Sequence, residues 1–95
     1  MKNVLIIGAT GTLGSAARQA ILDGTDDKLT LFARSTNRIR IVDDNREKVI
    51  SGNVMNDADL DKAMAGQNAV FAALSGNLKA YAEKIVAAMD RNNVS

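Results

Sequence analysis

The sequence contains no histidine, cysteine, proline or tryptophan, and its aromatic residues are one tyrosine and two phenylalanines. Without histidine or cysteine, the chain cannot form the usual zinc sites, a disulfide, a thiol nucleophile or a Ser-His-Asp triad. Acid–base chemistry within this chain would have to use Tyr81, lysines or carboxylates. The absence of cysteine is typical of a reducing compartment, so we expect a cytoplasmic protein.

Excess charge and long apolar runs are lacking as well. The formal net charge of +1 predicts binding neither to nucleic acid nor to an anionic membrane surface. The apolar run at 4–7 is too short for a signal peptide, and no segment approaches the roughly 20 apolar residues of a membrane helix. Because domains typically have about 100–150 residues, the 95 residues predict one small domain.

Short apolar runs alternate with helical patterns along the chain. We expect strands at 4–7, 28–33, 48–50 and 69–74, helices at 12–23, 57–64 and 78–89, and an ambiguous segment at 35–41. This alternation predicts an α/β fold in which helices cover a parallel sheet through right-handed crossovers. Leu13 and Val86 are expected on apolar helix faces, Asp57 as a helix N-cap, and three methionines in or near the core, namely Met55, Met64 and Met89.

The strongest motif is a glycine-rich turn between the first strand and the first helix. Gly8 allows a tight turn after the strand, Gly11 allows phosphate to approach the backbone, and Gly14 allows the helix to pack closely on the sheet. Free N–H groups and the positive end of the helix dipole would then hold a pyrophosphate. The turn therefore predicts a dinucleotide-binding site, which requires this strand–turn–helix context.

The spacing G-x-x-G-x-x-G, with the sequence GATGTLG, resembles that of the short-chain dehydrogenase/reductase superfamily. It is most similar to the extended and atypical branches, including the NmrA-like NAD(P)-binding proteins. The resemblance implies a Rossmann-like doubly wound sheet, in which these strands would have the order 3-2-1-4. Residues 1–95 would form the N-terminal, cofactor-binding portion of an NAD(P)-binding domain, with the remainder expected beyond position 95. The turn residues that would hold the cofactor are Gly8, Thr10, Gly11, Thr12, Leu13 and Gly14.

The end of the second strand indicates which dinucleotide binds. NAD-binding folds usually carry an acid about 20 residues past the glycines, but this chain has Arg34 there. A guanidinium suits a ribose 2′-phosphate, and Ser35 can donate a hydrogen bond beside it. We therefore expect NADP, with NAD as the alternative, and interpret Arg38 and Arg40 as surface charges.

Two further segments are weaker candidates. The resembling family commonly places an aspartate and an apolar residue after the third strand, where this chain has Asn53 and Val54. An amide oxygen can still accept from the adenine amino group, but both could equally be turn residues. Around the end of the fourth strand, the family passes small residues under the ribose and pyrophosphate, which makes Ala73, Leu74 and Ser75 secondary candidates.

No catalytic or metal-binding residue is assigned within this chain. Catalytic members of the family use Tyr-x-x-x-Lys after the fifth strand, whereas Tyr81 and Lys84 lie three apart after the fourth, and Tyr81 falls on an apolar stripe. We expect part of an NADP-dependent oxidoreductase that transfers hydride to or from a small-molecule substrate. The alternatives are an NADP-binding regulator or redox sensor of NmrA-like type, and a nucleotide-sugar epimerase or dehydratase. The sequence leaves homo-oligomerisation open.

Overall fold

The computed structural model describes residues 2–8, 12–34, 39, 41, 45–73 and 78–94. Strands and helices follow one another along these residues. The bounds are β1 (Asn3–Ile7), α1 (Thr12–Gly24), β2 (Lys28–Ala33), β3 (Glu47–Ser51), α2 (Asp57–Met64), β4 (Ala69–Ala72) and α3 (Leu78–Arg91). β2 and β3 are the only consecutive strands among the described elements. Most of the ambiguous segment at 35–41 lies outside the described residues.

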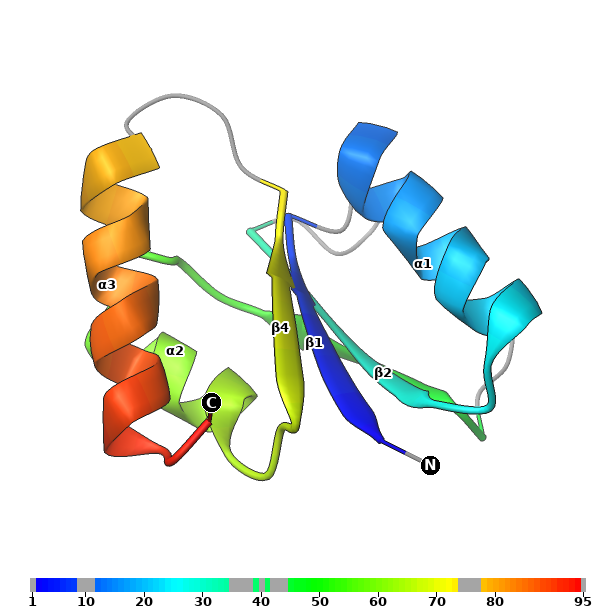
Figure 1. The fold of residues 1–95 in the computed structure, drawn as a ribbon. Helices are drawn as coiled ribbons and strands as arrows, with labels where there is room; N and C mark the ends of the chain where they lie inside the picture. Colours follow the sequence, from blue (N-terminus) through cyan, green and yellow to red (C-terminus); the bar gives the residue numbers. More distant parts are fainter. Residues whose placement is uncertain are drawn as a thin grey trace.

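The four strands form one parallel sheet with the order β3-β2-β1-β4, which confirms the predicted order. Helix α1 covers one face of this sheet, and α2 and α3 cover the other (Figure 1). All strands run in the same direction, so their carboxyl ends share one edge of the sheet. β1 ends and α1 begins toward that edge, whereas β1 begins and α3 ends toward the opposite edge (Figure 1).

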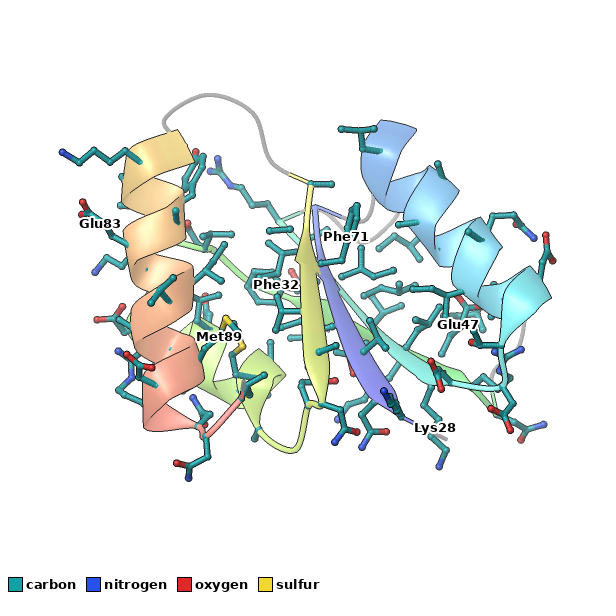
Figure 2. All side chains as sticks on the ribbon, in the orientation of Figure 1. Lys28, Phe32, Glu47, Phe71, Glu83 and Met89 are labelled. Atoms are coloured by element: carbon teal, nitrogen blue, oxygen red, sulfur yellow. The ribbon has the colours of Figure 1, made fainter. Side chains whose placement is uncertain are left out.

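The core has two parts because β1 is buried on both faces. Leu5 and Ile7 face α2 and α3, where they pack with Phe32, Leu60 and others. The alternate residues of β1 face α1 and form a smaller cluster, whose buried members are Val4, Ile6, Leu29 and Leu31. Figure 2 shows Phe32 and Met89 on the α2/α3 side and Glu47 beneath α1. Successive strand residues point to opposite faces, so the continuous apolar run of β1 fits this two-sided burial.

Three apolar residues expected in the core are exposed instead, namely Leu13 at 70%, Val86 at 56% and Met55 at 45%. The inward face of α1 runs through Gly14 and Ile21, so Leu13 is turned about 100° away from it. Val86 is similarly one residue beyond the buried Ile85. A one-residue shift in helical phase explains both errors. Met64 is fully buried and Met89 packs against the core, as predicted.

The N-cap of α2 is Asn56 rather than Asp57. The side chain of Asn56 accepts a hydrogen bond from the backbone N–H of Asp59, at 3.1 Å. Asp57 lies inside the first turn, where its negative charge still favours the positive end of the helix dipole. Asn and Asp are comparable as N-caps, so residue preference alone defines the start of this helix only to within one position.

Arg46, which precedes β3, forms hydrogen bonds with the C-terminal end of α1. Its guanidinium donates to the carbonyl oxygens of Leu22, Thr25 and Asp27 at 2.6–3.2 Å, with a longer contact to Ile21. The last carbonyls of a helix have no partner within the helix, so a cation at this end satisfies them and complements the dipole. Arg46 thereby joins α1 to the strand pair β2–β3.

The salt bridge between α2 and α3 should make stability depend on pH. Arg91 donates to Asp61 at 2.8 Å, and this hydrogen bond lowers the pKa of Asp61. Because the pKa of Asp61 is lower in the folded than in the unfolded protein, its ionised carboxylate stabilises the fold at pH values above the unfolded-state pKa. This stabilisation is lost as the pH falls through the folded-state pKa. We therefore expect Asp61→Asn to lower the urea midpoint at pH 7 and to match the unaltered protein at strongly acidic pH. A constant difference across this pH range would contradict the assignment.

Candidate dinucleotide-binding site

The glycine turn begins at the carboxyl edge of the sheet. Gly8 has φ +82°, a conformation that other residues adopt only with strain, and its N–H donates to the Phe32 carbonyl at 3.0 Å. α1 then starts at Thr12, and Gly14 is buried in its first turn. Thr10 and Gly11 lie outside the described residues. Gly8 thus has the tight-turn conformation predicted for it, and the burial of Gly14 is consistent with close packing of α1 on the sheet.

The start of α1 suits an anionic group. The helix has 13 residues, carries no acidic residue in its first turn, and points its N-terminus toward the carboxyl edge (Figure 1). Its first N–H groups lack partners within the helix, and the dipole adds positive potential there. A pyrophosphate therefore fits this end of α1. Leu13 is exposed in the same turn, where an apolar side chain could contact a bound cofactor.

Arg34 lies directly after β2 at the same edge. Its side chain is exposed and forms no ion pair with any residue that the structure describes. Two contacts hold the backbone around it: Ser51 Oγ donates to the Arg34 carbonyl at 3.3 Å, and the Gly52 N–H donates to the Ala33 carbonyl at 3.1 Å. The guanidinium is therefore available to a phosphate from a fixed backbone position. Ser35 falls outside the described residues, as do Arg38 and Arg40.

The loop between β3 and α2 brings Asn53 and Val54 to this edge. Asn53 Oδ1 accepts the N–H of Met55 at 2.9 Å, so the structure shows Asn53 as a turn residue. A contact of Asn53 with adenine stays a prediction, and its oxygen would have to serve two donors. The Val54 side chain is 7% exposed, and its backbone N–H has no partner among residues 45–73 or the other described segments.

Ala73 completes the edge after β4. Its N–H donates to the Ile7 carbonyl at 2.9 Å, which holds the chain beside the end of β1. Leu74 and Ser75 lie outside the described residues. Gly8, Arg34, Asn53 and Ala73 thus follow four adjacent strands at one edge, as the sequence predicted.

Sequence reasoning missed three residues that shape this edge: Ser51, Gly52 and Asp59. Helical spacing predicts a solvated position for Asp59, yet its carboxylate accepts the backbone N–H of Asn53 at 2.9 Å. Gly52 could have been recognised from the sequence, because a glycine at the end of a predicted strand suggests a close approach of the backbone to another group. Nothing in the spacing of Asp59 marks its contact with the loop.

The Tyr81–Lys84 pair has a structural explanation. Tyr81 is half-buried and packs against the larger core cluster, as predicted. Lys84 Nζ lies 3.2 Å from Asp57 Oδ1, and this ion pair links α3 to α2. Within the described residues, no group of three or more acidic side chains could hold a metal ion, and no helix could cross a membrane.

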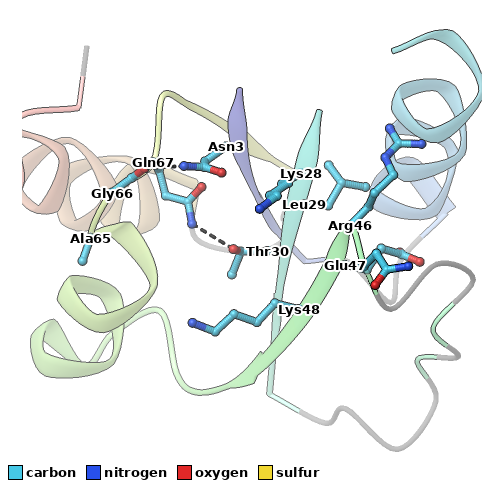
Figure 3. Close-up of a pocket in the computed structure, with 11 residues that line it drawn as sticks. Asn3, Lys28, Leu29, Thr30, Arg46, Glu47, Lys48, Ala65, Gly66 and Gln67 are labelled. Carbon is cyan, nitrogen blue, oxygen red and sulfur yellow. Dashed lines mark hydrogen bonds between the residues drawn. The ribbon is translucent and has the colours of Figure 1, made fainter. Parts of the chain in front are cut away.

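A hollow of about 350 Å³ lies at the other end of the sheet. Lys28, Thr30 and Lys48 line one side of it, and the turn that carries Gln67 lines the other (Figure 3). Gln67 Nε2 donates to Thr30 Oγ1 at 2.9 Å. Because Asn3 and Lys28 begin β1 and β2, this hollow is at the amino edge, away from the glycine turn.

Comparisons with known proteins agree with this geometry. A family model described as NAD(P)H-binding matches residues 8–95. A Rossmann-fold NAD(P)-binding family protein from Shigella flexneri is 38% identical with a TM-score of 0.90, over 100% of this chain and 49% of that one. A short-chain dehydrogenase/reductase from Veillonella parvula in complex with NADP is 31% identical with a TM-score of 0.87, over 98% and 44%.

A curated relative also supports an NAD(P)-binding oxidoreductase-type domain. Oxidoreductase ptaF of Pestalotiopsis fici is 29% identical over 82 residues, which cover 81% of this chain and 31% of that protein. The chain thus spans about a third to a half of these relatives. The resemblance to short-chain dehydrogenases/reductases is confirmed, while the NmrA-like branch stays a prediction. With its parallel sheet, glycine turn and family match, the chain belongs to the NAD(P)H-binding family of Rossmann-fold proteins.

Proposed function

We propose that this chain is the NADP(H)-binding part of a short-chain-type oxidoreductase that transfers hydride between the nicotinamide and a small-molecule substrate. The observation that carries the proposal is Arg34, an exposed guanidinium without an ion-pair partner in the described structure, at the end of β2. It follows the strand next to the glycine turn. A cation at this position favours a 2′-phosphorylated ribose over a free hydroxyl.

Each part of the carboxyl edge would hold a different part of the cofactor. The N-terminus of α1 would bind the pyrophosphate, Arg34 the 2′-phosphate, and the Asn53–Val54 loop the adenine. Ala73 is small enough for the ribose and pyrophosphate to approach the end of β4. The cytoplasmic location expected from the absence of cysteine belongs to the same proposal.

The second candidate is a non-catalytic NADP-binding regulator or redox sensor. It is favoured because Tyr81 packs against the core and Lys84 pairs with Asp57, so the described residues show no Tyr/Lys pair arranged for proton transfer. In the oxidoreductase, the catalytic tyrosine and lysine would belong to chain beyond position 95. A nucleotide-sugar epimerase or dehydratase fits less well, because such enzymes usually combine NAD with an acid where this chain has Arg34.

The test uses the intact protein in two steps. NADPH binding is followed by nicotinamide fluorescence, and oxidation of NADPH is then followed by absorbance in the presence of aldehydes and ketones. Binding with oxidation supports the oxidoreductase, and binding without oxidation across the panel supports the regulator. Failure to bind either NADPH or NADH would contradict both.

A further inference from the structure

One carboxylate contacts the backbone of the loop between β3 and α2. Asp59, in the first turn of α2, accepts the Asn53 N–H through Oδ2 at 2.9 Å. The N–H of Asp59 itself donates to Asn56 Oδ1 at 3.1 Å, which fixes the residue at the helix start. Because the acceptor is a carboxylate, this hydrogen bond is charge-assisted.

The loop has little room to shift because it passes between Asp59 and a core aromatic ring. A Cβ added at Gly52 would lie 2.8 Å from the Phe32 ring and 3.0 Å from the Asp59 Cβ. Phe32 is 1% exposed and cannot move without disturbing the core. Asp59 therefore helps to fix the position of the loop backbone relative to the sheet.

The position of this loop affects two groups that could bind a nucleotide, the backbone N–H of Val54 and the guanidinium of Arg34. The backbone N–H of Val54 has no partner in the described parts of the chain. The Arg34 carbonyl accepts from Ser51 Oγ at 3.3 Å, so the end of β2 is tied to the end of β3, where the loop begins. A displacement of Asn53 would therefore shift both the Val54 N–H and the backbone of Arg34.

We propose that Asp59 is a positioning residue for the adenosine end of the cofactor. It acts through the backbone of Asn53 and Val54, and this inference rests on the proposed function. Asn53 cannot replace it, because its own side-chain oxygen is engaged by the Met55 N–H at 2.9 Å. The Asn53 N–H is therefore held by a carboxylate six residues downstream.

The test compares Asp59→Ala with Asp59→Asn and with a control, Asp57→Ala. Asp57 is in the same helical turn, but its ion pairs are with Lys84 and Arg91 on α3. We expect Asp59→Ala to weaken binding of NADPH and of adenosine 2′,5′-bisphosphate about tenfold. Asp59→Asn keeps an acceptor oxygen and should restore most of the affinity. Asp57→Ala should leave both affinities nearly unchanged.

Amide hydrogen exchange gives a second readout that needs no ligand. The Asn53 N–H should exchange faster in Asp59→Ala than in Asp57→Ala, at equal global stability. If the unaltered protein binds NADPH but Asp59→Ala behaves like Asp57→Ala in both measurements, the positioning inference is overturned and the proposed function stands. If the unaltered protein binds neither nucleotide, the proposed function fails, and this inference fails with it.

Discussion

Replacing Arg34 by alanine should weaken NADPH binding about ten- to a hundredfold and leave NADH binding nearly unchanged. The guanidinium is exposed at the end of β2 and forms no ion pair within the described segments. A charge-assisted hydrogen bond to a phosphate is worth about 1.5–3 kcal/mol, which corresponds to this loss. The two nucleotides differ only at the 2′-position, so comparing their dissociation constants isolates the contact.

Two variants control for the loss of positive charge. Arg34→Lys keeps the charge but loses the planar fork, and it should fall between the unaltered protein and Arg34→Ala. Arg91→Ala removes an exposed arginine at the C-terminal end of α3, toward the opposite edge of the sheet (Figure 1). It should not discriminate between NADPH and NADH. Equal losses for both nucleotides in Arg34→Ala would contradict the role of this residue in binding the 2′-phosphate.

Replacing Arg18 by methionine should destabilise the fold by about 3–5 kcal/mol. Arg18, on α1, donates through Nε to Glu47 Oε2 on β3. The Glu47 side chain is inaccessible to solvent and that of Arg18 is 15% exposed, so removing the arginine takes a cationic partner from a buried carboxylate beneath α1. Domains of this kind have a total stability of about 5–15 kcal/mol, so the loss is a large part of it. Urea unfolding followed by circular dichroism measures the change.

A double variant distinguishes the free-energy cost of the buried Glu47 charge from the loss of side-chain packing. Arg18→Met combined with Glu47→Leu removes both charges of this ion pair, so most of the lost stability should return. If the double variant is less stable than Arg18→Met alone, packing of the two side chains matters more than their charge. Loss of the cationic partner of Glu47 would then not be the cause of the destabilisation.

The sheet could be predicted from sequence because its signals are local and strong. The apolar run of β1 and the two described glycines of the turn define a strand, a turn and a helix over residues 3–24. Parallel strands with helical crossovers then leave few topologies, and the order 3-2-1-4 is among them. For the same reason, the positions of Arg34 and Asn53 after their strands could be assigned to one edge from the sequence.

The remaining features depend on contacts between segments far apart in the chain. Arg46 and Glu47 look like ordinary surface charges in the sequence, but one fastens the end of α1 and the other is buried beneath it. The exposure of Leu13 depends on the angle at which α1 meets the sheet, which periodicity defines only to within a residue. The contact of Asp59 with Asn53 spans six residues, but helical spacing alone does not reveal it.

The most direct test of NADP(H) binding is a calorimetric titration of the unaltered intact protein with NADPH and with NADH. We predict saturable binding of both nucleotides, with NADPH binding at least about tenfold more tightly, since the 2′-phosphate adds a contact with Arg34. Equal affinities, or tighter binding of NADH, would contradict a cofactor site selected by Arg34.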